Sequence, residues 1–467
     1  MLIEIHMIQN HSPSNLNRDD LGAPKTCIFG GVMRNREASQ CLKRSIRRSP
    51  LFQSLLEKEG GVRTRRLISV LAEKASYPQE PQKDLIDFVA KAFEHGGVSR
   101  TQKGEEPDNT NILLFVPRSA IEKMADAAKK AWEMKKAPDV LANELAIILG
   151  TFAAVPDIAL CGRMTELDRS GLFAKINLTG EAALSVSHAI STHAVTNEVD
   201  YFTAVDDLGK GMATAHVDEA QFSSACLYKY FSLDWEQLVD NLHGPMPAKP
   251  KKPGKDATND EKTAYSQYPQ TYEAWQKARS DAEKLAAATL GHFILAATQT
   301  TPSGKQHSFA AFNEPCSILV EIKAAKTPTS YANAFAEPAR KVGNAPDDAA
   351  DCVSLLGRSI AQFGDHVYCM RRAYGSDSTL LWYSHQPWRY PLQGWDREDD
   401  GRKAKARGEN GQLTEREKPP VQFASKRFDI LGGNGQPGLI EAVIEELHLN
   451  LRWADVKDAG KAQDTEA

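Results

Sequence analysis

The segment best suited to bind a polyanion is SQCLKRSIRRS, at residues 39–49. Leu42 and Ile46 are four residues apart, which predicts the buried stripe of an amphipathic helix. Ser39 is expected to cap this helix, and Gln40 can add a polar contact to sugar or phosphate. The opposite side would carry two cationic rows that can neutralise successive phosphates, formed by Lys43, Arg44, Arg47 and Arg48. Taken alone, the pattern fits an RNA-binding face and a solvated charged face equally well.

Charge is unevenly distributed along the chain. The net charge of the whole chain is −4, which gives no reason to expect a nucleic-acid partner. Residues 34–66, however, contain ten Lys or Arg against three Glu. Such local clustering is the electrostatic mark of phosphate binding. Immediately before this segment, Gly30 and Gly31 indicate a turn. They would also let the backbone approach a phosphate closely.

The cysteines and histidines do not indicate metal or redox chemistry. The seven cysteines form no C-x-x-C pair, and their odd number argues against a secreted disulfide framework. His188 and His193 are five residues apart, but no Cys or carboxylate is placed to complete a zinc set. We therefore expect no metal and no cofactor.

Length and composition limit the class of protein. At 467 residues the chain is long enough for two to three domain-sized units, and 41% hydrophobic residues are enough to form a core. No apolar run approaches the roughly 18 residues of a membrane-spanning helix. The first residues, MLIEIHMI, lack the basic start and cleavage site of a signal peptide. We expect a cytoplasmic protein without membrane association.

Strand and helix patterns alternate along the chain, which predicts an α+β fold. Period-two alternation occurs at residues 3–7, 184–190 and 318–322. Helical stretches are expected at about 83–93, 118–135, 139–149, 272–298, 347–373 and 437–447. Because helical stretches dominate residues 55–180, that part is predicted to be a helical insertion.

Two stretches have the composition of surface additions. Residues 244–262 are rich in Pro and Lys, and residues 395–420 are highly charged. Both are predicted to be flexible loops, and the residues from 459 onward a disordered tail. The basic residues of the two loops are candidate nucleic-acid contacts, although the composition alone favours a solvated loop.

Several motifs in a fixed order carry a resemblance to a known family. They are NLNRDD at 15–20, K-x-x-x-FGG at 25–31, the SQ-x-LKR-x-x-R helix, DIALCGRM at 157–164, SVSHAISTHAV at 185–195, DYFTAVDDL at 200–208, FSS at 222–224 and AAFN at 310–313. Together they resemble the CasC-type backbone subunit of the type I-E CRISPR Cascade complex. The resemblance extends from residue 1 to about residue 340.

The resemblance implies a hand-shaped protein with an RRM-like (ferredoxin-like) palm, a helical finger insertion and a long thumb loop. The palm would comprise residues 1–55, a strand at 181–191 and residues 223–467, including the additions at 244–262 and 395–420. The fingers would occupy residues 56–180 and the thumb residues 192–222.

The resemblance also implies which residues touch nucleic acid. The guide backbone would be held by Arg18, Lys25, Gln40, Lys43, Arg44 and Arg47, with support from Lys305 and Gln306. Met164, beside Arg163, would contact guide bases. The thumb would place five residues near the guide–target duplex: Tyr201, Phe202, Thr203, Val205 and Val217. Without the resemblance, DYFTAVDDL would be interpreted as a buried strand, and GRM as a loop with a packed methionine.

The implied function is a non-catalytic CRISPR RNA-binding subunit that oligomerises along the guide RNA in antiviral defence. Its expected partners are CRISPR RNA, the target DNA strand, other copies of itself, other Cascade subunits and a helicase-nuclease. The chain departs from the family pattern at Ala38 and Cys41, where hydroxyl side chains are expected, and at Glu37, which adds a negative charge to the basic stretch.

An alternative function is a metal-dependent ribonuclease that uses Asp206 and Asp207. Adjacent residues of a strand point to opposite faces, so these carboxylates cannot readily share one ion. A third interpretation, an RRM-like RNA-processing endonuclease, needs a general acid and base that the sequence does not indicate.

Overall fold

The structure of the chain is a computed structural model. The described residues are 1–56, 60–80, 83–101, 108–151, 155–163, 171–175, 180–205, 214–244, 246–247, 249–252, 258–340, 354–374, 378–384, 406–407, 413–414, 438–449, 451 and 453–457. Met164, Asp206 and Asp207 lie outside this part of the chain, as do the tail after residue 457 and most of the addition at 395–420.

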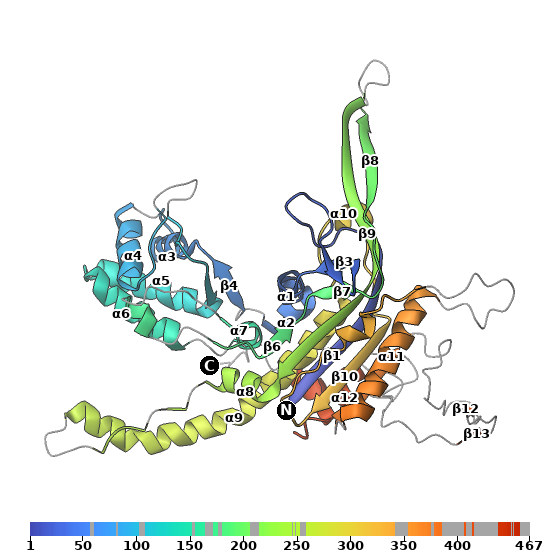
Figure 1. Ribbon diagram of the computed structural model, residues 1–467. Helices are drawn as coiled ribbons and strands as arrows, with labels where there is room; N and C mark the ends of the chain where they lie inside the picture. Colours follow the sequence, from blue (N-terminus) through green and yellow to red (C-terminus); the bar gives the residue numbers. More distant parts are fainter. Residues whose placement is uncertain are drawn as a thin grey trace. The chain divides into compact units, whose positions relative to one another are not determined.

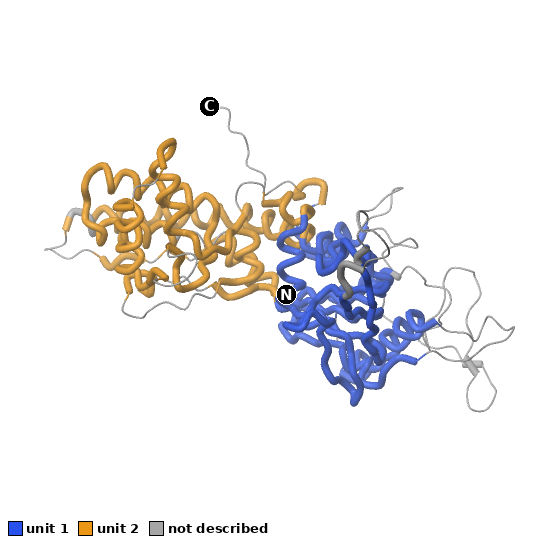
Figure 2. Tube along the Cα trace, turned by 90° about the horizontal axis from the view of Figure 1, so that it is seen from above, with its two compact units in different colours: residues 1–49, 185–233, 293–452 blue, residues 50–184, 234–292, 453–467 orange. Residues whose placement is uncertain are grey.

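The chain divides into two compact units, each built from three separate stretches (Figure 2). Unit 1 contains residues 1–49, 185–233 and 293–452. Unit 2 contains residues 50–184, 234–292 and 453–467, and therefore includes segments outside the range predicted as fingers.

Unit 1 is built on a nine-stranded sheet whose main path runs β11-β10-β1-β9-β7-β3-β2, with β6 and β8 each paired to β9. The strands are β1 (Leu2–Ser14), β2 (Thr26–Phe29), β3 (Val32–Glu37), β6 (Leu184–Val186), β7 (Ala189–Ser191), β8 (Glu198–Val205), β9 (Thr214–Asp234), β10 (Ser317–Lys323) and β11 (Ser378–Ser384). The central strand β1 is antiparallel to β10, with Leu2 opposite Lys323. Residues 2–9 of β1 are all buried, so both faces of the sheet are covered at this strand.

Helices cover the sheet of unit 1 (Figure 1). They are α1 (Ser39–Arg48), α10 (Gln306–Phe309), the 3-10 helix η2 (Ala332–Phe335), α11 (Leu355–Tyr374) and α12 (Leu439–Glu445). The core between the sheet and α11 is largely aromatic and includes Tyr228, Phe335, Phe363 and Trp382. A two-stranded pair, β12 (Ala406–Arg407) with β13 (Leu413–Thr414), is separate from this sheet.

Unit 2 is mainly helical. Its elements are α2 (Pro50–Leu56), β4 (Gly61–Thr64), α3 (Leu67–Ser76), α4 (Lys83–His95), β5 (Leu114–Pro117), α5 (Arg118–Glu133), α6 (Pro138–Thr151), α7 (Pro156–Cys161), η1 (Leu172–Lys175), α8 (Trp235–His243), most of α9 (Asn259–Gln299) and α13 (Trp453–Val456). Apolar faces of α3 to α6 form a core that includes Leu71, Phe93, Met124 and Leu145.

The predicted α+β class is confirmed, and the predicted helices at 83–93, 118–135 and 139–149 match α4, α5 and α6 to within two residues at each end. The predicted loop at 244–262 is wrong from residue 259 onward, because α9 begins there and not near residue 272. This stretch is poor in apolar residues, but its Glu, Lys, Gln and Ala are good helix formers. No helix in the described part of the chain is long and apolar enough to cross a membrane.

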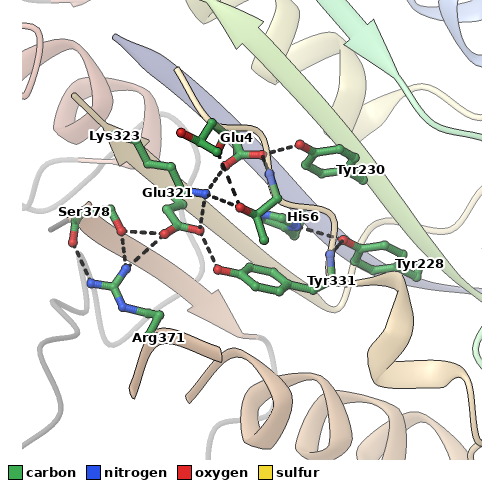
Figure 3. Close-up of polar contacts among 11 residues, drawn as sticks. Glu4, His6, Tyr228, Tyr230, Glu321, Lys323, Tyr331, Arg371 and Ser378 are labelled. Atoms are coloured by element: carbon green, nitrogen blue, oxygen red, sulfur yellow. Dashed lines mark hydrogen bonds and ion pairs between the residues drawn. The ribbon is translucent and has the colours of Figure 1, made fainter. Parts of the chain in front are cut away.

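A buried polar network lies across β1, β9, β10 and β11 (Figure 3). Lys323 forms an ion pair with Glu4, and Arg371 of α11 pairs with Glu321, with 3.1 Å between Nη1 and Oε1. The hydroxyl of Tyr331 donates to Glu321 Oε2 at 2.8 Å, and Tyr230 donates to Glu4. The two carboxylates and two cations therefore balance each other inside the protein, where unpaired charges would be costly.

Candidate nucleic-acid interface

Helix α1 presents its cations on one side because its apolar residues are fixed on the other. Leu42 and Ile46 are 3% and 5% exposed, which confirms the predicted buried stripe. Leu42 packs with Ala189 of β7, with Val195 of the loop after β7, and with Ala225 and Leu227 of β9. Of the polar residues, Gln40, Arg44 and Arg48 are exposed, whereas Lys43 and Arg47 are half-buried. The helix contains no acidic residue, and Arg47 and Arg48 in its last turn interact favourably with the helix dipole.

The start of α1 is held by a residue far away in the sequence. The prediction that Ser39 caps this helix is wrong, because the N-cap is Ala38 and it has no side-chain capping bond. Instead, Asn17 Oδ1 accepts a hydrogen bond from the Ala38 amide at 2.7 Å. The ring of His188 accepts one from the Ser39 amide at 3.3 Å. The NLNRDD motif therefore fixes the position of the basic helix.

The loop that carries Arg18 is tightly folded. Asp19 Oδ1 accepts hydrogen bonds from the amides of Leu21 and Ala23, at 3.0 and 2.9 Å. The buried side chain of Asn15 donates to Gly22 O and to Gln221 O, both at 2.8 Å, and so ties the loop to β9. Arg18, which forms a β-bridge with Pro24 across the loop, is exposed, and Lys25 at the end of the loop is half-buried. A compact loop holds both cations at defined positions.

The SGKQ loop at 303–306 packs directly against the NLNRDD loop. A Cβ atom on Gly304 would lie 2.3 Å from the carbonyl oxygen of Leu16, so only glycine allows this approach. Lys305 is exposed and adopts a left-handed backbone with φ of 50°. Gln306 is only 8% exposed, and its Nε2 donates to Pro302 O at 3.1 Å. A direct phosphate contact by the Gln306 side chain is thus not supported, because this residue braces the loop that presents Lys305.

These three motifs meet around one open groove of unit 1, with a cavity volume of about 490 Å³. Arg18, Asp19 and Asp20 line it from the first loop, Arg44 and Ser45 from α1, and Ser303 and Gly304 from the third loop. The groove thus lies along the exposed side of α1, where Arg18 and Arg44 provide positive charge. Two rigid loops and a helix free of acidic residues can hold a phosphate backbone without contacting its bases.

Arg34 of the basic stretch and Gly30 just before it stabilise the fold and do not contribute to the cationic surface. Arg34 is fully buried, and its guanidinium donates to the carbonyl oxygens of Phe29, Ser191 and Phe335. It therefore cannot belong to the basic surface. Gly30 is needed for packing, because a Cβ there would lie 1.7 Å from the carbonyl oxygen of Ala336. The expected phosphate approach at Gly30 is thus wrong, since protein backbone already occupies that space.

The departure at Glu37 has a structural explanation. Glu37 is buried and its Oε2 lies 3.6 Å from Nζ of Lys229, which is also buried. Burial raises the pKa of Glu37, and the nearby Lys229 opposes that shift. His11 lines the same small polar cavity, and burial, followed by the charge of Lys229, lowers its pKa to about 3. The charge of Glu37 is therefore compensated within the core and does not weaken the cationic face of α1.

The segment predicted as the thumb contains a hairpin of β8 and β9 that extends beyond the rest of the sheet (Figure 1). Tyr201 and Phe202 are 72% and 43% exposed, and Thr203 is also exposed. Val217 lies opposite Thr203 in the hairpin, and Val205 is the last residue of β8. Neighbouring residues of a strand face opposite sides, so Tyr201 and Phe202 offer one aromatic side chain on each face of the ribbon. The alternative of a buried strand is wrong for these residues.

Arg163 lies in unit 2 and is only 5% exposed. Its backbone pairs with Gly180, and burial lowers the pKa of its guanidinium. This burial does not favour a direct guide contact by the Arg163 side chain. Met164, Asp206 and Asp207 lie outside the described residues, so the structure adds nothing to the predictions for them.

The histidines considered as metal ligands have other partners. His188 accepts a hydrogen bond from the Ser39 amide, and His193 Nε2 accepts one from the Cys226 amide at 3.1 Å. No group of three or more metal-ligating side chains occurs within the described ranges. Asn17, which both positions α1 and lines the groove, was missed by the sequence analysis. Nothing in a single sequence links an asparagine to a helix that begins 22 residues later.

Comparison with known proteins gives a family and a number of solved structures, among them the two that follow. The family model described as "CT1975-like protein" matches residues 3–396. A chain of a "CRISPR RNA-guided surveillance complex, pre-nicking" is similar with a TM-score of 0.61 and 25% identity, covering 84% of this chain and 95% of that chain. A chain of a "CRISPR RNA-guided surveillance complex" has a TM-score of 0.43 and 20% identity, covering 83% of this chain and 90% of that chain. No curated protein sequence gives a significant match.

The family match covers most of the 467 residues and includes the groove motifs at 15–20, 39–48 and 303–306. The chain therefore belongs to the CT1975-like family of CRISPR-associated proteins.

Proposed function

We propose that this chain is the repeated, non-catalytic backbone subunit of a type I-E CRISPR surveillance complex. In this role it binds CRISPR RNA along the groove of unit 1 and oligomerises along the guide with further copies of itself and other Cascade subunits. The bound guide is then presented for pairing with target DNA, after which a helicase-nuclease is recruited. In such complexes base pairing supplies the sequence specificity, whereas the protein reads backbone and shape.

The observation that carries this proposal is the convergence of three motifs on one groove. Arg18, Arg44 and the loop before Lys305 come from segments up to 286 residues apart, yet they border the same 490 Å³ space. Arg18, Arg44 and backbone groups of the loops offer contacts that suit phosphates and carry no base information, and Asp19 and Asp20 place two carboxylates in the same lining. The similarity to a chain of an RNA-guided surveillance complex supports a CRISPR RNA as the proposed polyanion.

The exposed aromatic pair of the hairpin supports the same role. Base–aromatic stacking contributes about 1 to 3 kcal/mol per base and tolerates every sequence. A guide-binding protein must accept any spacer, so Tyr201 and Phe202 are suited to separate bases at the guide–target duplex. Thr203, Val205 and Val217 are proposed to complete this contact on the same hairpin.

The direct test is the RNA that the protein carries. The full chain should be produced together with a CRISPR array and the other subunits, purified, and its nucleic acid extracted and sized. We expect a uniform RNA of about sixty nucleotides, because a guide that spans many subunits occupies several nucleotides on each. Heterogeneous cellular RNA, or no RNA, would contradict a guide-binding role.

The absence of catalysis needs a test of its own. The chain should be incubated with Mg²⁺ or Mn²⁺ and labelled single-stranded RNA, RNA–DNA hybrid and DNA. We expect no cleavage. Cleavage that disappears in the Asp206→Ala, Asp207→Ala variant would replace the scaffold proposal by the metal-dependent ribonuclease.

A further inference from the structure

The amino-terminal half of α9 is exposed on nearly all sides. Among its described side chains, none between residues 262 and 281 is buried, and Ala282 is the first that is. Four rings follow one another along this region with centroid separations of 4.2, 5.8 and 5.9 Å: His243, Trp275, Tyr272 and Tyr268. We call these four rings the aromatic ladder. Because the aromatic ladder lies on an otherwise exposed part of α9, we expect another segment of the chain to cover these rings.

The Pro/Lys segment at 244–252 begins at this ladder. Trp275 Nε1 donates to Gly244 O at 3.4 Å, and His243 Nε2 shares a 2.6 Å hydrogen bond with Trp275 O. Helix α9 starts at Asn259, about 24 Å before Trp275 along the helix axis at 1.5 Å per residue. Residues 245–258 therefore connect Gly244, beside Trp275, to the start of α9.

The prolines and the lysines of the segment differ in their exposure to solvent. Pro247 and Pro250 are half-buried, whereas Lys249, Lys251 and Lys252 are exposed. They belong to neither helix nor strand, and proline-rich sequences favour the polyproline II conformation, which repeats every three residues. The two prolines are three apart and thus share one side, away from which the lysines can extend.

The cations of α9 and those of the segment differ in their partners. Lys277 pairs with Glu273, Arg279 with Asp240 and Glu283, and Lys284 with Asp281. No ion pair of Lys249, Lys251 or Lys252 occurs among the described residues, and none of the three has an acidic neighbour between residues 244 and 252. Their charge is therefore available to an external anion.

We propose that Lys249, Lys251 and Lys252 form a second nucleic-acid contact of this chain, which binds a phosphodiester backbone without reading bases. Three lysines within four residues span about 9 Å at 3.1 Å per residue, a length that matches roughly three nucleotide steps of a duplex strand at 3.4 Å each. The prolines limit the conformations of the free segment, so little entropy is lost when the lysines engage a strand. The contact belongs to unit 2 and is independent of guide binding by the groove of unit 1.

The test is a salt titration of nucleic-acid binding by the full chain. The probes are a 30-base-pair DNA duplex of arbitrary sequence and a 30-nucleotide single-stranded RNA, followed by fluorescence anisotropy. Replacing all three lysines by alanine should lower the slope of log affinity against log salt by about 2.7 on duplex, or about 2.1 on a single strand, since each phosphate contact contributes about 0.9 or 0.7. The probe that shows the larger loss identifies the preferred source of the phosphates.

Two control variants make the result decisive. Lys277→Ala, Arg279→Ala, Lys284→Ala removes the same charge from cations that are already paired, and it should leave the slope nearly unchanged. Lys43→Ala, Arg47→Ala removes charge from α1 of unit 1, so its effect should add to that of the segment variant. An unchanged slope on both probes, or an equal loss in the α9 control, would overturn the second contact. Neither result would bear on guide binding by unit 1, which the Lys43→Ala, Arg47→Ala variant tests separately.

Discussion

Unit 1 uses charged residues in two opposite ways. On α1 the cations lie outside a buried stripe, and no acidic residue of the helix offsets them. In the network of Glu4, Glu321, Lys323 and Arg371, two acids face two bases, and each side chain is at most 9% exposed. Charges that are balanced inside the sheet stabilise the fold, whereas the exposed Arg44 and Arg48 of α1 can contact a bound anion.

This contrast is tested most strongly by breaking the buried network. Lys323→Met keeps the volume of the side chain but leaves Glu4 without its cation, so we expect a loss of about 3 to 5 kcal/mol in the free energy of unfolding. Denaturant titration followed by circular dichroism measures it. The matched control is Lys326→Met, since Lys326 is exposed three residues later and its loss should cost less than about 0.5 kcal/mol. Equal effects of the two variants would remove the contrast.

The apolar side of α1 should behave like the network. Leu42→Ala removes a side chain that is 3% exposed, and we expect a loss of about 2 to 5 kcal/mol in unfolding free energy from lost contacts and the cavity left behind. The same denaturant titration measures this loss. A fully stable Leu42→Ala variant would mean that α1 does not depend on this face for its position.

Acid should lower the free energy of unfolding through two buried histidines. Burial, followed by the charge of Lys323, lowers the pKa of His6 to about 3, and His11 has a pKa of about 3 from burial and Lys229. The unfolded chain binds these protons near pH 6.5, so stability is fully present above that pH and is lost as the pH falls toward 3. Between pH 6.5 and 4.5 we expect a loss of about 2 to 3 kcal/mol per histidine.

Unfolding free energies measured across this pH range test the linkage. The His11→Gln variant should lose about half of the steepness, even if the variant is less stable at every pH. An identical pH slope in the variant would show that His11 titrates normally in the folded protein.

The smallest effect on stability, and the largest on binding, is expected on the cationic side of α1. Lys43→Ala, Arg47→Ala should lower the free energy of unfolding less than Leu42→Ala does, because neither side chain belongs to the buried stripe of α1. The slope of log RNA affinity against log salt should fall by about 1.4, equally for unrelated guide sequences. Long assemblies on RNA should fail more completely than binding to a short oligonucleotide, because each copy repeats the defect. A normal slope with normal assembly would identify this helix as a solvated face.

The sequence predicted the elements better than their connections. The alternation in β1 and the i, i+4 stripe of Leu42 and Ile46 were correct, because each pattern is local and is read from a few neighbouring residues. The capping of α1 by Asn17 was not predictable, since it joins a loop to a helix through tertiary folding. The ordered motifs of the family, rather than periodicity, indicated that the three groove segments act together.

Burial of individual cations was the main source of error. Arg34, within the basic stretch, is fully enclosed and bonds three carbonyl oxygens, whereas Arg44 ten residues later is exposed. A count of basic residues treats the two as equal. Which of them reaches the surface depends on the strand face in one case and on the helix face in the other.

The pairing of β1 with β10 also affects how the protein is made. Leu2 is paired with Lys323, which is synthesised 321 residues later. At about 5 to 20 residues per second, one edge of this buried strand waits roughly 15 to 60 seconds for its neighbour. During that time the nascent chain exposes an apolar strand with unpaired backbone groups, which is a ready site for aggregation. We therefore expect chaperones to shield strand β1 during translation.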